Sequence, residues 1–352
     1  MQINRNELIG IIKNLNPGLA NKEIIEQSTH VIFYKTTICS YNDEIFVSLP
    51  LDCGFVGTVD ASLLLKIVSK YEEEEIKLEI SPQGNKLDIY GDVNSASLSL
   101  VTDSPIFKHL DEVLATCRGI KDWKTLPKDF QVGIEMCAFS ASRDRTLGAM
   151  CCLRIEGEDI LSTDKYRIGW YVMEQGMGKF LLEADHALEI SRYKLLDRYS
   201  LANGWINFKS EKGMYMSCRI VEPPVEEFDL RTFFSVNEDA ARMKLPSDLI
   251  KRAELAGVLS EGTTAMERQV ELSFKGDEVV CRSKSEKGEI ESRSKLEKPA
   301  PFPVTVQISP DLLIEILKFV SSTVIFQKID EDRGKAIFRT RGFSHVIMVR
   351  LV

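Results

Sequence analysis

The residue types that carry catalysis or bind metals are present in this sequence, but they are scattered. The eight cysteines include no CxxC pair and the four histidines no HExxH pair, so neither spacing supports a metal site. Carboxylates gather in two places, Asp159 with Asp164 and the run 330–332. No matched acid, base or metal ligand accompanies them, and no GxGxxG or GxxxxGK[ST] motif occurs. We therefore predict no catalytic residue, no metal and no cofactor, and a carboxylate-based cleft enzyme remains an alternative.

The composition is that of a globular protein. The 352 residues are 44% hydrophobic and 28% charged, and no apolar run approaches the roughly 20 residues that span a bilayer. The beginning of the chain lacks the features of a signal peptide, and the cysteines sit among apolar residues as small buried side chains do in a reducing compartment. We expect a cytoplasmic protein without a membrane partner.

The net charge of −8 is unusual for a protein that binds nucleic acid, which normally carries a basic excess. The net charge does not argue against nucleic-acid binding if the basic side chains gather on one surface. The positions of lysine and arginine along the chain therefore matter more than the total charge.

A short amphipathic helix pattern occurs three times, at intervals of about 125 residues. It begins at Asp60, at Asp185 and around Asp311, and each copy has an acidic start, an apolar stripe and a late basic residue. In the first copy, Leu63, Leu64, Ile67 and Val68 are expected to face the sheets. The recurrence predicts three copies of one domain.

Each third of the sequence predicts the order helix, strands, helix, strands. Helices are expected over 4–15, 60–71, 126–139, 185–199, 245–259 and 310–320. Strands are expected over 29–34, 37–41, 44–49, 54–59, 77–80, 86–90, 96–101, 150–156, 159–163, 168–172, 178–182, 205–209, 214–221, 268–274, 278–283, 289–296, 304–308, 323–328, 335–339 and 345–351, with linkers near 104–124 and 222–239. The predicted class is α+β, with three tandem domains over 1–118, 119–232 and 233–352, each with two helices packed on antiparallel sheets.

Three motifs give this architecture a family resemblance. The second third contains LSTDKYRIGWY from Leu161, the third contains ISPDLLIEILKFV, and the chain ends SHVIMVRLV. In this order the chain resembles, over its whole length, a divergent member of the bacterial sliding clamps, the beta subunits of DNA polymerase III. That family has a TDGHR-like turn in its second domain and an apolar C-terminal strand. Here Lys165 and Tyr166 stand where the family usually has Gly-His, and Val349 stands where a proline is common.

The resemblance implies a non-enzymatic processivity factor of DNA replication. Two chains would form a head-to-tail homodimeric ring around double-stranded DNA, without sequence preference, and the helices would line the hole. Lys66 and Lys70 share one helix face. The expected DNA-binding residues are Lys13, Lys22, Lys66, Lys70, Arg143, Arg145, Arg192, Arg198, Lys251, Arg252 and Lys318.

The resemblance also implies a pocket for short linear motifs of DNA polymerase and the clamp loader. A flexible methionine among apolar residues suits such peptides. The residues expected in this pocket are Leu147, Thr163, Lys165, Tyr166, Arg167, Ile168, Ser309, Leu312, Val346, Ile347, Met348, Val349, Arg350 and Leu351. A clamp-fold interaction protein that forms no ring is the second alternative, and solution mass would distinguish it.

Overall fold

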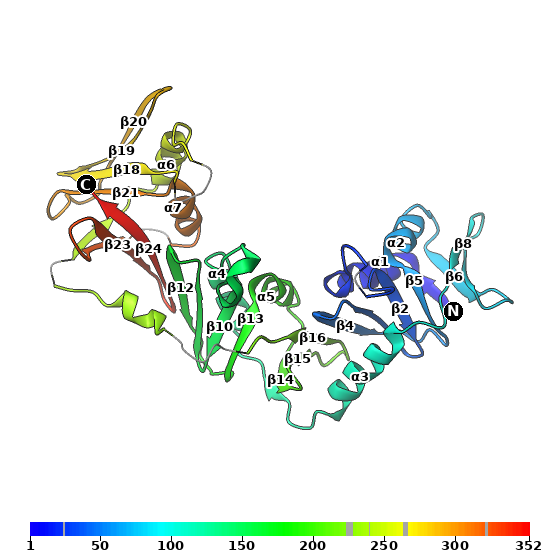
Figure 1. The fold of residues 1–352 in the computed structure, drawn as a ribbon. Coiled ribbons are helices and arrows are strands. Elements are labelled where there is room, and N and C mark those ends of the chain that lie inside the picture. Colours follow the sequence, from blue (N-terminus) through cyan, green and yellow to red (C-terminus); the bar gives the residue numbers. More distant parts are fainter. Residues whose placement is uncertain (24, 223–227, 239, 263–266, 321–322) are drawn as a thin grey trace. The chain divides into compact units, whose positions relative to one another are not determined.

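The computed structural model describes residues 1–352 except 24, 223–227, 239, 263–266 and 321–322 (Figure 1). The chain divides into two compact units. Unit 1 holds residues 1–126 and 189–221, and unit 2 holds residues 127–188 and 222–352. The middle third of the sequence thus contributes to both units, and the three domain boundaries expected from the sequence stay a prediction.

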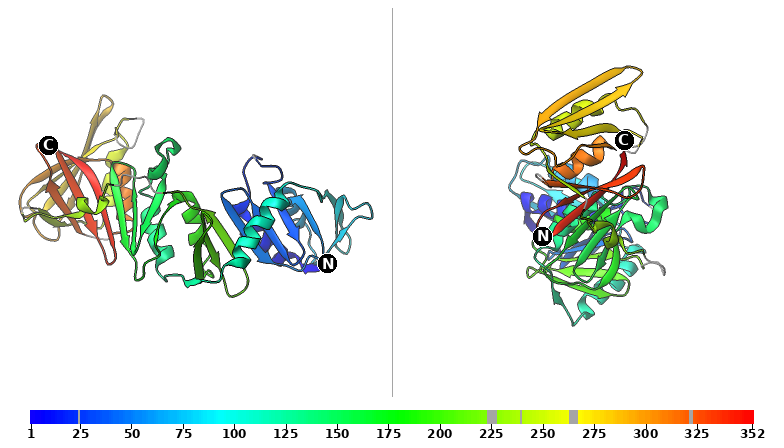
Figure 2. Two further views of the ribbon diagram at one scale, coloured as in Figure 1. Left: turned by 60° about the horizontal axis from the view of Figure 1, so that its bottom comes forward. Right: turned by 90° about the vertical axis from the view of Figure 1, so that its left-hand side faces the viewer.

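The secondary structure is a mixture of short helices and antiparallel strands (Figures 1 and 2). The helices are α1 (Arg5–Asn14), α2 (Ala61–Val68), α3 (Ile106–Gly119), α4 (Phe130–Ala138), α5 (Ala184–Ser191), α6 (Leu249–Gly257) and α7 (Pro310–Leu317), and the 3-10 helices are η1 (Asn16–Gly18), η2 (Arg145–Cys151) and η3 (Leu230–Phe234). The strands are β1 (Gln2–Asn4), β2 (His30–Tyr34), β3 (Thr37–Tyr41), β4 (Ile45–Pro50), β5 (Val56–Asp60), β6 (Glu75–Ile80), β7 (Lys86–Tyr90), β8 (Ser95–Ser99), β9 (Lys124–Thr125), β10 (Cys152–Glu156), β11 (Asp159–Thr163), β12 (Arg167–Val172), β13 (Lys179–Glu183), β14 (Arg198–Ala202), β15 (Trp205–Lys209), β16 (Tyr215–Arg219), β17 (Ala241–Lys244), β18 (Val270–Lys275), β19 (Glu278–Ser285), β20 (Gly288–Lys295), β21 (Val304–Ile308), β22 (Thr323–Lys328), β23 (Arg333–Arg339) and β24 (Phe343–Leu351). The predicted α+β class with antiparallel sheets is confirmed. None of the helices in the described residues is long and apolar enough to cross a membrane.

The three thirds of the chain repeat one strand order. Repeat 1 holds β1–β8, repeat 2 holds β9–β16 and repeat 3 holds β17–β24. In each repeat a short leading strand pairs with the strand after the second helix, as in β1–β6, β9–β14 and β17–β22. We call the sheets β1-β6-β7-β8, β9-β14-β15-β16 and β17-β22-β23-β24 the A sheets, and β5-β2-β3-β4, β13-β10-β11-β12 and β21-β18-β19-β20 the B sheets.

Strand pairing joins successive repeats by one rule. The last strand of the repeat 1 B sheet, β4, pairs with the last strand of the repeat 2 A sheet, β16, and Ser48 lies opposite Tyr215. In the same way β12 pairs with β24, and Arg167 lies opposite Ile347. We call these pairings joint 1–2, which lies in unit 1, and joint 2–3, which lies in unit 2. Each joint converts two exposed sheet edges into a continuous antiparallel ladder.

The caps of the second helices correct the register of the sequence repeat. The Asp60 carboxylate caps α2 by accepting a hydrogen bond from the backbone N–H of Leu63 at 2.7 Å. The corresponding cap of α7 is Ser309, which accepts from the N–H of Leu312. Asp311 lies inside the first turn of α7, so it is not the counterpart of Asp60. In α2 and α7 the position that recurs is a capping side chain after a strand, and the acidic residue itself is shifted.

Two predictions for the second helices were wrong. Leu63 was expected to face the sheets but is 49% exposed, whereas Leu64 and Val68 are fully buried. The helix predicted over 185–199 ends at Ser191, and Arg198 belongs to β14. Pairing with β9 and β15 supplies the backbone hydrogen bonds of β14, so tertiary pairing overrides the local helical pattern.

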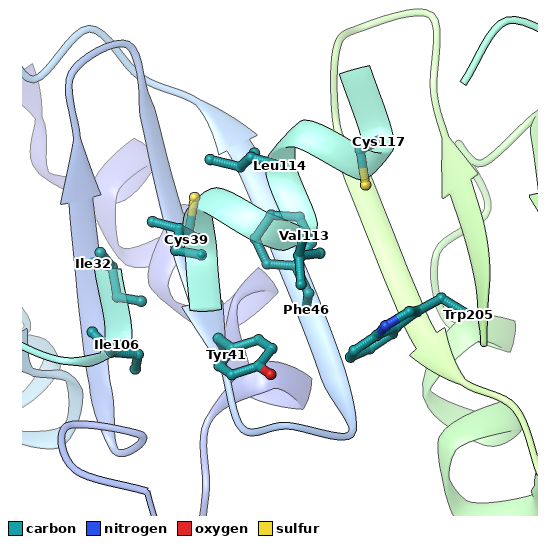
Figure 3. Packing of buried hydrophobic residues seen from close by; sticks show 10 residues of the cluster. Ile32, Cys39, Tyr41, Phe46, Ile106, Val113, Leu114, Cys117 and Trp205 are labelled. Carbon is teal, nitrogen blue, oxygen red and sulfur yellow. The ribbon is translucent and has the colours of Figure 1, made fainter. Parts of the chain in front are cut away.

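The linker predicted over 104–124 is largely the helix α3. Its apolar residues recur at helical spacing, and they pack on strands from both sides of joint 1–2 (Figure 3). The resulting core contains Ile32, Cys39, Tyr41, Phe46, Ile106, Leu110, Val113, Leu114, Cys117 and Trp205. At the far end of α3, the Cys117 thiol lies 3.6 Å from Asn207 Oδ1. The helix thus covers the joint between repeats 1 and 2. The prediction of a linker was wrong because proline and acidic residues, which are typical of linkers, occur beside and within the apolar period of this helix.

Candidate functional site

A groove of about 670 Å³ opens at joint 2–3. The turn between β11 and β12 forms one wall, the loop around η2 forms a second, and α7 forms a third. The lining residues are Ala141, Ser142, Arg143, Asp144, Leu147, Asp164, Lys165, Tyr166, Arg167, Asp311, Leu312 and Glu315. Because all three walls belong to unit 2, the groove is built within one compact part of the chain.

The β11–β12 turn is held by its own side chains. The Asp164 carboxylate accepts hydrogen bonds from the backbone N–H groups of Tyr166 and Arg167, both at 3.1 Å. The Thr163 hydroxyl accepts from Lys165 N–H at 3.2 Å and donates to the Arg167 carbonyl at 2.8 Å. Lys165 has a φ of 80°, a region that favours glycine. The turn therefore keeps a glycine-like backbone although lysine occupies the position, and this places the half-exposed Tyr166 ring at the rim of the groove.

Arg167 connects the two repeats that form the groove. Its guanidinium side chain is 8% exposed and donates to Asp164 on the same turn at 2.8 Å and to Glu315 on α7. It also lies over the Phe139 ring, 5.4 Å from the centroid. A buried arginine needs paired anions because its charge is removed from water. Arg167 thus acts as a tie between the turn and α7 and is largely neutralised, which leaves little charge for a ligand.

Five of the predicted pocket residues line this groove: Leu147, Lys165, Tyr166, Arg167 and Leu312. The others are not among its lining residues. Ile168, Val346, Ile347 and Val349 are buried, Thr163 and Ser309 act through the turn and helix-cap bonds above, and Leu351 is opposite Val306 on β21. Met348 donates its backbone N–H to the Tyr166 carbonyl at 2.9 Å. Its side chain, with Val349 and Arg350, lines a separate open groove of about 760 Å³ beside residues 330–333.

The structure adds polar residues that the sequence prediction omitted. Ser142 and Asp144 come from the η2 loop, and Asp311 and Glu315 come from α7. Arg268 pairs with Asp311 at 3.0 Å, so the acidic side of the groove is partly neutralised. The one available signal was the i, i+4 spacing of Asp311 and Glu315, which places both on the helix face that carries Leu312.

His345 lies beneath the groove in the centre of joint 2–3. Its ring is fully buried against Phe139, with centroids 5.2 Å apart, and its Nδ1 lies 3.3 Å from the Ser140 hydroxyl. Burial, reinforced by the positive charge of Arg167, lowers the pKa of His345 well below its usual value. His345 is therefore neutral at physiological pH, and its role is to fill the joint.

The predicted DNA-binding residues differ in how free their charges are. Exposed lysines without an ion pair in the described part of the chain are Lys13, Lys22, Lys66, Lys70, Lys251 and Lys318. Four arginines have partners: Arg192 with Glu189 at 2.7 Å, Arg252 with Asp248 at 3.0 Å, Arg145 with Glu183 at 3.1 Å, and Arg198 with the Thr125 hydroxyl at 3.3 Å. Arg143 is exposed and lines the groove. Because Arg198 belongs to β14, it does not share a helix face with Arg192.

No family model and no curated protein sequence matches this chain, but solved structures match it over almost its full length. The DNA polymerase III beta chain of Streptococcus pneumoniae is 16% identical, with a TM-score of 0.84 over 99% of this chain and 98% of that one. The beta subunit of Pseudomonas aeruginosa is 12% identical, with a TM-score of 0.80 over 100% of both chains. The sliding clamp of Bacillus subtilis is 13% identical, with a TM-score of 0.80 over 99% of this chain and 98% of that one. The resemblance found in the sequence is confirmed for the fold: this chain has the three-domain fold of the bacterial DNA polymerase III beta sliding clamps.

Proposed function

We propose that this chain is a DNA sliding clamp that closes as a head-to-tail homodimeric ring around duplex DNA and tethers polymerase and other replication proteins through the groove at joint 2–3. The proposal joins three parts: ring closure, passage of DNA and capture of peptides. Each part is supported by different residues. The protein would act without catalysis, as an accessory subunit of a polymerase.

The observation that carries the proposal is the repeated joint. Joints 1–2 and 2–3 pair the last strand of a B sheet with the last strand of the next A sheet. By the same rule the B sheet of repeat 3 presents β20, and the A sheet of repeat 1 presents β8. Neither strand has a partner on its outer edge in the described residues. Antiparallel pairing of β20 with β8 of a second copy would continue the series, and two such pairings close a ring.

Helical residues beside the two edges support this pairing. Leu312 on α7 and Leu63 on α2 occupy equivalent positions, because each gives its backbone N–H to the capping residue of its helix. At joint 2–3 Leu312 is covered and only 5% exposed, whereas Leu63 is 49% exposed. Helix α2 contacts β8. The equivalent apolar position is thus covered at an internal joint but exposed beside a free edge. This difference favours a second copy of the chain as the cover of Leu63.

The charge distribution suits a protein that surrounds DNA without gripping it. The net charge is −8, so strong contact over the whole surface is disfavoured. Lys66 and Lys70 are exposed on or just beyond α2 and have no ion pair in the described residues. A few free lysines give weak, salt-sensitive attraction to phosphates. Retention would then come from the closed ring, which leaves the protein free to slide.

The groove suits a short peptide with apolar side chains. Tyr166 and Leu147 provide the accessible apolar contacts, and Leu312 lines the groove with little of its surface exposed. The ion pairs of Arg167 hold the walls in place. Such a groove gains affinity from being largely formed before the peptide binds. The Lys165 and Tyr166 side chains stand at the rim, so they would adjust which motifs fit.

Sedimentation equilibrium tests the ring first. A dimer predicts twice the chain mass of 39.8 kDa, and a strict monomer at micromolar concentration would instead favour an interaction protein without a ring. A panel of fluorescein-labelled peptides from the polymerase and clamp loader of the source organism then tests the groove by anisotropy. A dimer that binds none of them would leave the ring intact and remove the groove from the proposal.

A further inference from the structure

We propose that the segment 228–238, which contains η3, is a strap that locks joint 2–3, and that Arg231 and Lys335 are positioning residues for the peptide groove. The sequence predicts only a linker here. The described part of this linker is instead bound to both repeats at once. The inference rests on the proposed function for its peptide readout, but the locking itself can be measured without any peptide.

The first anchor ties the strap to repeat 2. Arg231 donates to Asp159 and to Glu156, both at 2.8 Å, on the two strands β10 and β11. Glu156 also pairs with Arg154 at 3.1 Å and with Lys179 at 3.2 Å. Burial alone would raise the pKa of Glu156, but the hydrogen bonds from Arg231 and Lys179 and the charge of Arg154 lower it to about 2. The acceptor is thus ionised at any physiological pH, and charge-assisted hydrogen bonds of this kind are the strong ones.

The second anchor ties the strap to repeat 3. Lys335 on β23 is 5% exposed, and its ammonium donates to the Phe233 carbonyl at 2.8 Å and to the Ser235 carbonyl at 2.7 Å. Arg339 on the same strand donates to the Phe234 carbonyl at 2.5 Å. A buried ammonium with its hydrogen bonds made to backbone carbonyls fixes a segment regardless of that segment's side chains. This anchor therefore does not use the carboxylate of Asp229, which pairs with Arg231 within the strap at 3.1 Å.

An apolar plug lies between the two anchors. Phe234 is 3% exposed and its ring lies 5.1 Å from the Trp170 ring on β12. The cluster around it contains Ile168, Ile325, Ile337 and Val346, from strands on both sides of the joint. Trp170 in turn donates its indole N–H to Asp159 at 2.7 Å, the same carboxylate that Arg231 binds. The strap therefore packs on β12 and β24 together and couples its polar anchor to its apolar plug.

This placement matters for the groove because β12 begins at Arg167, in the wall of the groove. The turn at 164–166 belongs to repeat 2 and α7 belongs to repeat 3, so their separation depends on how firmly β12 and β24 pair. Loosening the strap is expected to let this pairing open more often. Peptide affinity then falls because the competent geometry is populated for less of the time.

The test compares Arg231→Met and Lys335→Met with Arg282→Met, a matched control. Arg282 lies on β19 and has a similar pair of carboxylates, Glu291 at 2.6 Å and Glu271 at 3.6 Å, but it is outside the joint. Each strap variant is expected to raise amide exchange in β12, β24 and the 163–168 turn about tenfold and to weaken the best peptide of the panel about tenfold. Exchange in β18–β20 should be unchanged, and Arg231→Lys should recover part of both losses.

The outcomes separate the strap from the proposed function. Unchanged exchange across β12 and β24 in both strap variants would overturn the inference. Faster exchange there with wild-type peptide affinity would also overturn it, because the strap would then be structural and not positioning. If the wild-type protein binds no peptide, the proposed groove fails, and faster exchange confined to the joint and the 163–168 turn still decides in favour of the strap.

Discussion

The ring of Phe139 is stacked on the ring of Phe319, with centroids 4.9 Å apart and planes 4° apart. Phe139 is the C-cap residue of α4, and Phe319 follows α7, so the pair closes joint 2–3 between the helices. In repeat 3 the C-cap residue of α6 is Val258, which is 73% exposed. Helix α6 contacts β20, the free edge of the repeat 3 B sheet. Val258 thus holds, beside this free edge, the position that Phe139 holds at joint 2–3, and in the proposed ring a second copy would cover it.

We predict that Val258→Asp converts the dimer to a monomer. A carboxylate at this position would have to be buried without a partner when β20 pairs with a second copy. The dissociation constant should rise at least about a hundredfold, from the several kcal/mol that such burial requires. Sedimentation equilibrium over a range of protein concentrations measures this shift.

The matched control for that experiment is Leu195→Asp. Leu195 is 63% exposed but is not on an element that carries a free joint edge. The control should keep the dimer mass. Loss of the dimer in the control as well, or its survival in Val258→Asp, would contradict the pairing of β20 with β8.

Tyr166→Ala is expected to weaken peptide binding without disturbing the dimer. The Tyr166 side chain is 44% exposed at the rim of the groove, whereas its backbone carbonyl accepts from Met348 and stays in place in the variant. Loss of an aromatic contact at a binding groove should lower affinity about tenfold or more. Anisotropy with the best peptide of the panel checks this, and Tyr90→Ala, at a tyrosine that is 39% exposed on β7, should bind as the wild type does.

Lys165→Gly should stabilise the turn. Lys165 has a φ of 80°, and a side chain in this region costs about 1–2 kcal/mol, of which glycine's extra chain entropy offsets about half. The free energy of unfolding should therefore rise by about 0.5–1 kcal/mol. Thermal unfolding followed by circular dichroism measures the gain. Lys165→Ala keeps a side chain at the same φ, so an equal gain in that variant would show that backbone strain is not the cause.

His345 predicts a pH dependence of stability. Burial and the charge of Arg167 lower its folded pKa below the unfolded value near 6.5. Below that pH the unfolded chain binds a proton that the folded chain excludes, so the stability present above pH 6.5 is lost as the pH falls. The loss can reach about 1.4 kcal/mol per pH unit.

Unfolding of the wild type and of His345→Phe at several values between pH 7.5 and about 5 tests that dependence. The aromatic neighbours Phe139, Phe338 and Phe343 offer a suitable environment for the new ring. The variant should lose much of the slope. The same slope in both proteins would assign the acid sensitivity to other groups.

The sequence predicted the repeated elements well because each depends on a local pattern. The strands at Thr37–Tyr41 and Val304–Ile308 have the predicted bounds, since turn residues border their apolar runs. The short strands β1, β9 and β17 were missed because each has two to four residues and exists through pairing with a distant strand. Chain length and local periodicity carry no information about such partners.

In the groove, too, some residues could be predicted from the sequence, whereas contacts between distant residues could not. Tyr166 and Leu312 could be placed from a family resemblance, and both line it. The tie from Arg167 to Glu315 and the strap anchored by Arg231 join residues far apart in sequence, and no local pattern pairs them. The helix α3 is a different case, because the apolar period that begins at Ile106 is a local pattern that indicates a helix. The surrounding proline and acidic residues indicated a linker instead.

The last prediction concerns the positive charge that would face DNA. Lys66 and Lys70 are exposed without an ion pair in the described residues, whereas Arg192 and Arg252 already face Glu189 and Asp248. Phosphates would therefore interact more favourably with the lysines, because each arginine must first break its ion pair with a carboxylate. The double variant Lys66→Gln/Lys70→Gln should reduce the slope of log affinity against log salt by about 2 on a short labelled duplex, between about 50 and 200 mM salt. Arg192→Gln/Arg252→Gln removes the same formal charge and should change the slope by less. Equal changes in the two double variants, or none in the first, would show that α2 does not face the DNA.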